Sequence, residues 1–190
     1  MTSSMADFLL TRCTAWALVG LLMVMDSSGS WAAEKTPNAG STSQDNCELT
    51  DRKREMLSLI NEARSQARQC GDQSFAAVKP LTWNCTLEEA AEAHSQDMAE
   101  NDYFSHTGPD GVGIQQRVSS RGYVWRAVGE NIAAGQASIA AVVEGWLESP
   151  SHCGNIMNDA FTEMGMAKSK PGESGSVYRS YWTQVLAQPR

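Results

Sequence analysis

The chain has 190 residues, enough for one domain of ordinary size or for a smaller domain with appended segments. Its formal net charge is −7, with 15 basic residues (Lys and Arg) against 22 acidic residues, and the basic residues form no cluster. An acidic chain without a basic patch is a poor nucleic-acid binder, so we expect no nucleic-acid partner.

Residues 1–32 have the features of a secretory signal peptide. Arg12 precedes an apolar run at residues 13–25 (CTAWALVGLLMVM), and small residues follow, with Ser30 and Ala32 placed for cleavage. The alternative is a membrane anchor, but the apolar run is shorter than the roughly 20 residues that a spanning helix needs. We therefore expect cleavage, no stable membrane anchor afterwards, and a secreted or periplasmic monomer.

The cysteines beyond residue 32 are even in number. They are Cys47, Cys70, Cys85 and Cys153, and in an exported chain they predict two disulfides. No spacing has the CxxC pattern of a metal or redox pair. The sequence alone leaves three possible connectivities.

The predicted folded part begins after a polar lead. Residues 33–46 contain Pro, Gly and Ser without periodicity and are predicted to be a flexible linker before a domain at residues 47–190. From Thr50 the apolar residues recur at three- and four-residue spacing. This pattern predicts a first helix that ends at Cys70 and Gly71.

A second helix follows a loop at residues 72–80 and a short apolar connection at residues 81–84. Thr86 and Glu89 have the spacing of a capping box at its start, and the helix is predicted to end around Asn101. Its apolar face carries Leu87, Ala90, Ala91, His94 and Met98.

Two more helices are predicted in the second half of the chain. The first covers residues 113–121 and is closed by Gly122. The second covers residues 138–148 and is stopped by Pro150.

The C-terminal part changes to a strand pattern. Residues 164–167 and 178–186 are apolar, β-branched or aromatic runs separated by a Gly, Ser and Pro loop, so we predict an antiparallel hairpin. Helices followed by strands indicate an α+β domain.

His106 is the strongest candidate for a site residue. It follows the aromatic residues Tyr103 and Phe104 and precedes a Gly-Pro-Asp-Gly turn, which would leave its imidazole at a surface cleft. Residues 129–135 (GENIAAG) and 149–155 (SPSHCGN) each combine an ionisable side chain with small residues. We predict that these segments form the other walls of one site.

Two neighbouring residues are interpreted differently. His94 lies on an apolar helix face, which favours a hydrogen-bonded structural histidine. Ser105 precedes His106, but adjacent residues in an extended segment point to opposite sides, so the two are poorly placed as a nucleophile and its base.

Four ordered motifs resemble the CAP superfamily, also called the SCP domain. They are HSQDMAENDYFSH, GENIAAG, SPSHCGNIM followed by FTEMGMA, and YWTQV, and together they extend over about residues 50–187. The superfamily includes cysteine-rich secretory proteins, antigen 5 and pathogenesis-related protein 1, and the chain is similar to its short bacterial branch. The resemblance implies a three-layer α-β-α sandwich with a small antiparallel sheet and a cleft on one side.

The resemblance also implies a cleft with two histidines and two acids. By motif these are His106, Glu130 and His152, while the second acid falls where this chain has Ser149. Glu148 lies one residue earlier and completes the predicted cleft, although a shift of one residue turns a helical side chain by about 100°. Two imidazoles and a carboxylate suit a weakly bound zinc ion at His106 and His152. The alternative is a polar cluster in which both histidines hydrogen-bond to Glu130.

For the disulfides, the resemblance implies that Cys70 pairs with Cys153 and Cys47 with Cys85. For function it favours a secreted, non-enzymatic binding module whose cleft holds a divalent metal, a small extracellular ligand or a lipid. The alternative is a metal-assisted or serine-type hydrolase that uses the same cleft, and a third possibility is an interaction module that uses only exposed loops. The absence of a nucleophile elbow or an HExxH pair in the sequence weighs against the hydrolase.

Overall fold

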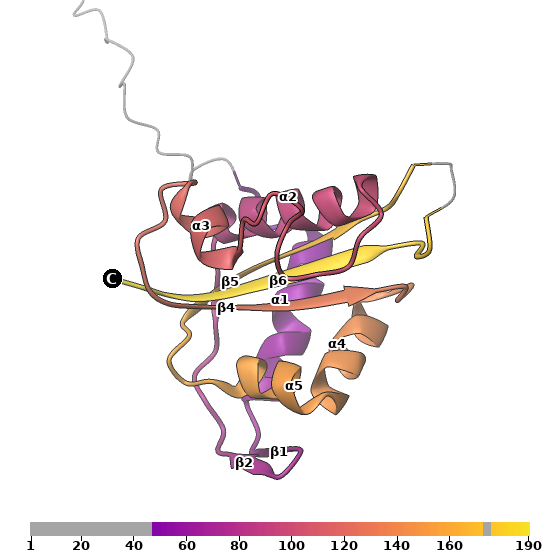
Figure 1. Ribbon diagram of the computed structural model, residues 1–190. Helices are drawn as coiled ribbons and strands as arrows, with labels where there is room; N and C mark the ends of the chain where they lie inside the picture. Colours follow the sequence, from indigo (N-terminus) through magenta and orange to yellow (C-terminus); the bar gives the residue numbers. More distant parts are fainter. Residues whose placement is uncertain (1–46, 173–175) are drawn as a thin grey trace, which may run out of the picture. The chain divides into compact units, whose positions relative to one another are not determined.

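A four-stranded sheet lies at the centre of the computed structural model, which describes residues 47–172 and 176–190 (Figure 1). The predicted signal peptide and linker lie outside the described residues. The strand order is β3-β5-β6-β4; β3 is parallel to β5, and the other pairs are antiparallel. The strands are β3 (Thr82–Trp83), β4 (Trp125–Ala134), β5 (Glu163–Ser169) and β6 (Tyr181–Pro189).

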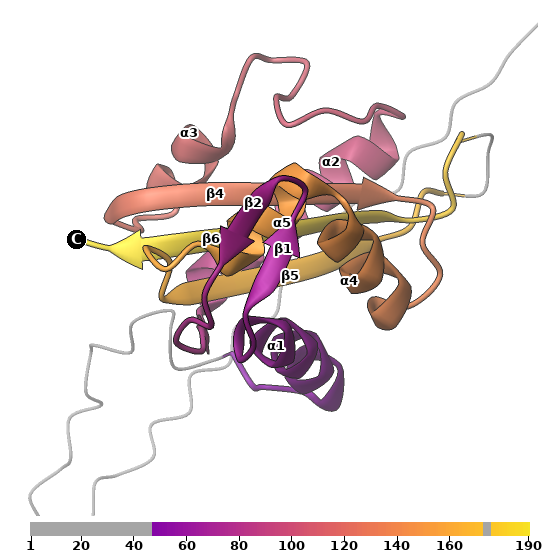
Figure 2. The same ribbon diagram turned by 90° about the horizontal axis from the view of Figure 1, so that it is seen from below.

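Helices cover both faces of this sheet, as Figures 1 and 2 show. One face carries α2 (Cys85–Glu100) and α3 (Ile114–Ser119), and the other carries α1 (Asp51–Arg64), α4 (Ile139–Glu148) and α5 (Pro150–Met157). The predicted α+β sandwich with a small sheet is therefore confirmed. No helix in the described ranges combines the length and the apolar character needed to cross a membrane.

The alternation of side chains along β6 divides the core between the two faces. Trp182 and Leu186 pack with α1, α4 and α5, whereas Val185 and Ala187 pack with α2. Successive side chains of a strand point to opposite faces, so one strand contributes to both apolar layers. Residues 181–187 of β6 are all buried, as expected for a strand covered by helices on both faces.

The first helix is shorter than predicted. It ends at Arg64, and the chain then forms a separate hairpin of β1 (Arg68–Cys70) and β2 (Gln73–Phe75), with Gly71 at φ 62° in the turn. A glycine adopts this conformation without steric cost, so Gly71 closes a hairpin rather than the helix. Figure 2 shows the hairpin crossing in front of α5.

Arg64 explains why the chain turns here. Its guanidinium is buried and donates to the backbone carbonyl oxygens of Lys79, Ile156, Asn158 and Phe161. Burial lowers the pKa of Arg64 to about 10. The end of α1 is thereby fixed to the segment that follows α5.

The start of α2 also differs from the prediction. The helix begins at Cys85, and the N-cap is Asn84, whose Oδ1 accepts from the Leu87 amide at 3.1 Å. The capping-box assignment of Thr86 and Glu89 is therefore wrong, because both lie inside the helix. The apolar face is as predicted: Leu87, Ala90, Ala91, His94 and Met98 are all buried.

The two segments predicted as site walls are regular elements. Residues 129–134 belong to β4, and residues 150–155 belong to α5. Pro150 ends α4, as predicted, but it also occupies the first position of α5, where its missing N–H costs nothing. The predicted hairpin of residues 164–167 and 178–186 is found as β5 and β6.

Two disulfides connect distant parts of the domain. Cys47 pairs with Cys85 and Cys70 with Cys153, with Cα separations of 5.7 and 5.5 Å. These are the pairs that the family resemblance implied. The first joins the segment before α1 to the start of α2, and the second joins β1 to α5.

Candidate functional site

The predicted site lies at β4, which is the outermost strand of the sheet. Glu130 points to the α2 face and is only 6% exposed. Its Oε1 is hydrogen-bonded to His106 Nδ1 at 2.8 Å, and its Oε2 accepts from an Arg117 terminal nitrogen at 2.6 Å. Both carboxylate oxygens are therefore engaged by cationic or ionisable side chains.

Arg117 is the residue that sequence reasoning missed. It lies on α3, is buried, and donates to the carbonyl oxygens of His106 and Val112 at 3.2 and 2.9 Å as well as to Glu130. One signal could have found it. Ile114, Arg117 and Val118 share a helix face by their spacing, and a buried arginine on an apolar face needs acceptors such as a carboxylate or backbone carbonyl oxygens.

His94 reaches the same cluster from α2. Its Nε2 is 2.9 Å from the Ser105 carbonyl oxygen and 3.9 Å from Glu130 Oε1, and the side chain is almost fully buried. Burial lowers the pKa of His94, and Arg117 lowers it further, whereas Glu130 opposes the shift. A neutral histidine that donates to a carbonyl oxygen agrees with the structural role that its helix face indicated.

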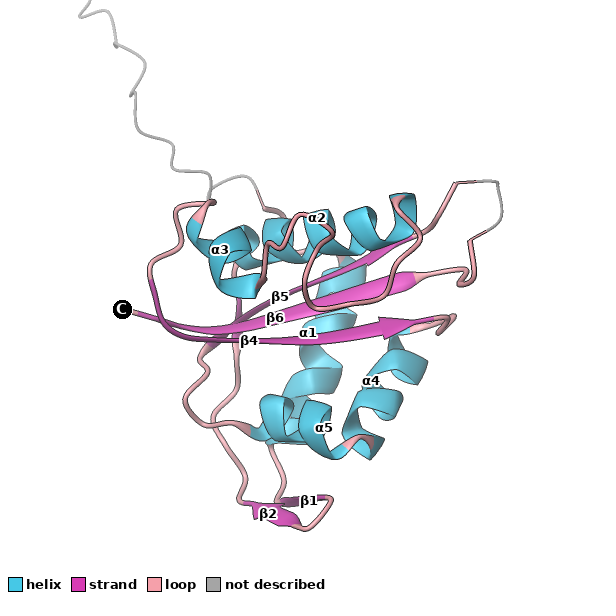
Figure 3. Ribbon diagram, viewed as in Figure 1, coloured by secondary structure: helices cyan, strands magenta, loops and turns pink. Residues whose placement is uncertain are grey.

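His106 belongs to the long loop between α2 and α3, which Figure 3 shows on the outside of the sheet. The side chain of His106 is 54% exposed, so its imidazole is accessible beside the buried Glu130. The Ser105 hydroxyl accepts from the Thr107 amide at 3.1 Å. No hydrogen bond joins Ser105 to the imidazole of His106 in the described part of the chain.

His152 approaches from the opposite face of the sheet, on α5. Its carbonyl oxygen accepts from Asn131 Nδ2 at 3.2 Å, and Asn155 Nδ2 donates to the Glu130 carbonyl and to Asn131 Oδ1. Burial lowers the pKa of His152, and the nearby His106 lowers it further. His152 is thus connected to Glu130 through backbone and amide groups rather than through the carboxylate.

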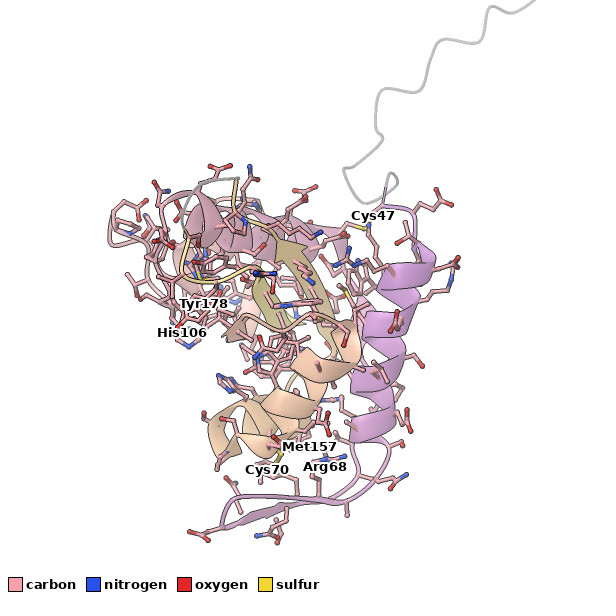
Figure 4. All side chains as sticks on the ribbon, turned by 90° about the vertical axis from the view of Figure 1, so that its right-hand side faces the viewer. Cys47, Arg68, Cys70, His106, Met157 and Tyr178 are labelled. Carbon is pink, nitrogen blue, oxygen red and sulfur yellow. A yellow bond between two sulfur atoms is a disulfide. The ribbon has the colours of Figure 1, made fainter. Side chains whose placement is uncertain are left out.

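A pocket of about 280 Å³ opens beside His152, and we call it the edge pocket. Its apolar floor includes side chains from β4 and α4, and its rim includes two aromatic rings, Phe104 and Tyr178, whose centroids are 6.0 Å apart. Figure 4 shows His106 and Tyr178 on the same side of the domain, far from Cys70 and Arg68. No aspartate or glutamate is among the described residues that line the edge pocket.

Glu148 is not brought to this site. It lines a separate groove of about 570 Å³ between α1 and α4, together with Glu62 and Glu144. The next residue, Ser149, lines the edge pocket instead. A turn of about 100° per residue along the helix accounts for this separation.

The side chains present do not fit a resident zinc ion. Within residues 47–172 and 176–190, no three His, Cys, Asp or Glu side chains are placed to hold a metal. A protein zinc site generally uses three or four side-chain ligands. Here Glu130 is already held by His106 and Arg117, which leaves two imidazoles.

Residues 57–186 match the CAP family, described as the cysteine-rich secretory protein family. The chain belongs to this family. Among curated proteins it is 39% identical over 107 residues to "Uncharacterized protein YkwD" of Bacillus subtilis (strain 168), a match that covers 56% of the chain and 39% of YkwD. It is 35% identical over 104 residues to "Uncharacterized membrane protein YlbC" of the same organism, covering 55% of the chain and 28% of YlbC. The chain therefore matches less than half the length of these relatives.

Solved structures of other CAP proteins share the fold. An extracellular protein containing an SCP domain from Bacillus anthracis superimposes with a TM-score of 0.58 at 28% identity, covering 75% of the chain and 45% of that protein. An outer surface protein from Borrelia burgdorferi gives a TM-score of 0.59 at 20% identity, covering 76% of the chain and 97% of that protein. The second likeness concerns the CAP fold alone.

Proposed function

We propose that this CAP domain is an extracellular binding module that holds a small ligand in the edge pocket, next to His106 and His152. The observation that carries the proposal is the state of Glu130. Its two carboxylate oxygens are held by His106 and Arg117, and none of these three side chains lines the edge pocket, so the cluster anchors β4 rather than contacting the ligand. The recognition surface is the adjacent hollow.

The extracellular location has independent support. Two disulfides suit an oxidising compartment, and the structural neighbours include proteins described as extracellular or outer-surface. We infer a secreted or cell-surface destination for this chain as well. The predicted signal peptide at residues 1–32 would direct that export.

The hydrolase alternative has weaker support. A general base must have a lone pair available to the proton that it removes, and a nucleophile must lie within hydrogen-bond reach of its base. The carboxylate of Glu130 is buried, which leaves it little access to a substrate, and the Ser105 hydroxyl accepts from the Thr107 amide. We therefore keep binding as the function and hydrolysis as an outcome to be tested.

Chemical-shift mapping of the isotope-labelled domain tests the binding role. Small neutral, anionic and cationic aromatic probes and zinc chloride should be titrated separately. We expect at least one organic probe to shift the amide signals of Ala133, Gly145 and His152, which belong to the edge pocket, and zinc to bind weakly because only two imidazoles are offered.

Signals around Glu62 and Glu148 in the groove between α1 and α4 are the internal control. If no organic probe shifts the edge-pocket signals, the proposed function is wrong.

A further inference from the structure

The free edge of β4 presents backbone donors to the edge pocket. The carbonyl oxygens of Glu130 and Ile132 accept from side chains of α5 and α4, at 3.2 and 3.1 Å, so both point away from β6. In an antiparallel pair the N–H and C=O of one residue point to the same side. The amides of Ile132 and Ala134 therefore face the free edge, and Gly135, the next residue, donates to the Ser180 carbonyl near β6.

This edge offers both donors and acceptors without partners, since the buried Gln136 Oε1 in the pocket lining has no hydrogen-bond partner among the described residues. The indole N–H of Trp146 occupies the Ile132 carbonyl, whereas no turn, loop or side-chain acceptor among the described residues takes the N–H of Ile132 or Ala134. The imidazole of His152 lines the same pocket. A ligand that complements this wall must bring acceptor oxygens for the amides and an N–H donor for Gln136 Oε1.

The spacing of the donors limits the kind of ligand. Amides two residues apart on a strand lie about 7 Å apart, too far to serve the two oxygens of one carboxylate. One amide, with His152, can receive a carboxylate, and the other can receive a carbonyl oxygen of the same molecule. A carboxylate followed within a few bonds by an acyl carbonyl is the chemistry of an N-acylated amino acid.

The rest of the pocket suits the side chain of such a ligand. Ile132, Val142 and Trp146 provide an apolar floor, and the described lining contains no acid that would repel a carboxylate. Phe104 and Tyr178 are 45% and 38% exposed at the rim. Exposed aromatic rings beside a pocket of about 280 Å³ can cover one apolar side chain.

We infer that the edge pocket recognises an N-acylated apolar amino acid through its carboxylate and its acyl carbonyl. The same chemistry occurs in a small acylated acid and in the C-terminal residue of a peptide. This inference rests on the proposed function, because it names the ligand chemistry of the same pocket.

Matched probes test it directly. N-acetyl-phenylalanine and N-acetyl-phenylalaninamide differ only in the carboxylate, and both should be titrated by chemical-shift mapping at fixed pH and salt. Hydrogen bonds to a charged acceptor are roughly twice as strong as neutral ones, so we expect the acid to bind about tenfold tighter than the amide. A tetrapeptide that ends in phenylalanine, with a free or an amidated C-terminus, distinguishes the two sources. If the peptide with the free C-terminus binds more tightly than N-acetyl-phenylalanine, the site is assigned to peptide termini. If the two bind equally, it is assigned to small acids.

Three variants locate the contact. Ala134→Pro removes an edge N–H that β6 does not use and should cost about tenfold in affinity for the acid. Gly145→Leu fills the pocket, because a Cβ at Gly145 meets no atom within 4 Å, and should abolish binding of both probes. Ala140→Leu, on the same helix but in the groove with Glu148, is the control and should change neither.

Equal affinity of acid and amide at the edge pocket would overturn the carboxylate assignment while leaving a binding module in place. The same holds if Ala134→Pro, shown to be folded, binds the acid as the parent does. If no organic probe binds at the edge pocket of the parent protein, the proposed function is wrong. Unchanged acid binding in Gly145→Leu would place the ligand elsewhere and also contradict the inference.

Discussion

Three buried or half-buried polar residues determine the chemistry around Glu130. Arg117 and His106 hold its two oxygens, and His94 lies 3.9 Å from one of them. His94 itself is held neutral by burial and by the positive charge of Arg117. The cluster therefore combines one ion pair with a neutral imidazole, which makes the domain sensitive to protonation.

The free energy of unfolding should depend on pH through His94. An unfolded histidine titrates near pH 6.5, whereas the folded pKa of His94 is lower, so the unfolded chain binds more protons below about pH 6.5. The contribution is fully present above that pH and is lost as the pH falls toward the folded pKa, with a slope of at most about 1.4 kcal/mol per pH unit for one imidazole.

Urea unfolding of the parent and of His94→Gln at several pH values between about 5 and 8 measures this slope. Glutamine can still donate to the Ser105 carbonyl but does not titrate, so the slope should be smaller in the variant. His152→Gln is the matched control. Because the pKa of His152 is lowered as well, this variant should remove only the contribution of His152 to the slope and leave that of His94 in place. An unchanged slope in His94→Gln would show that His94 is not the titrating group.

The site residues could be predicted only in part from the sequence. His106 and Glu130 stand in motifs beside turn residues or glycines, and the structure does bring them together. Arg117 was assigned only to a short helix, because its acidic partner belongs to another element and local spacing does not reveal it. Glu148 was predicted as a cleft residue from its nearness in sequence to Ser149, but the helix directs it to another groove.

At the scale of the elements, the contact between α2 and β5 is especially close. A Cβ at Gly165 would lie 2.0 Å from the Glu88 amide nitrogen and 2.3 Å from the Leu87 carbonyl carbon. Backbone atoms cannot move aside as a flexible side chain can. Glycine at this position therefore sets the distance between the helix and the sheet.

Gly165→Ala should destabilise the domain by about 3 kcal/mol or more, because α2 must separate from β5 to admit the methyl group. Gly145→Ala is the control. Gly145 lies in the interior of α4 with open space at its Cβ position, so alanine there should raise stability by about 0.5 to 1 kcal/mol. Thermal and urea unfolding would measure both, and a loss below about 1 kcal/mol for Gly165→Ala would contradict the tight packing.

Sequence periodicity predicted the helices with strong apolar stripes and the β5–β6 hairpin, since these patterns are local. It did not predict β4 as a strand. Glycine and alanine in GENIAAG have low strand propensity, and β4 forms because it pairs with β6, which lies far along the chain. Periodicity also missed α5, because Pro150 was interpreted as a helix stop and not as the first residue of a new helix.

At the scale of the whole molecule, the sandwich brings residues from both faces of the sheet together at its exposed β4 edge. Glu130, Arg117 and His94 lie on the α2 face, and His152 and Asn155 come from α5 on the other face. The Cys70–Cys153 disulfide connects α5 to β1 at the residue that follows His152.

The parent protein and Glu130→Gln, compared in hydrolysis and unfolding assays, test most directly whether Glu130 has a structural role or a catalytic one. The glutamine places an amide N–H₂ against the donors of His106 or Arg117, so we expect a loss of about 1 to 3 kcal/mol in stability. We expect no hydrolysis of peptide or ester substrates by the parent. Glu148→Gln, an exposed acid in the other groove, is the control and should change stability by less than about 0.5 kcal/mol. Reproducible turnover by the parent that falls by about 10² or more in Glu130→Gln, with stability unchanged, would contradict the binding role and establish a catalytic carboxylate.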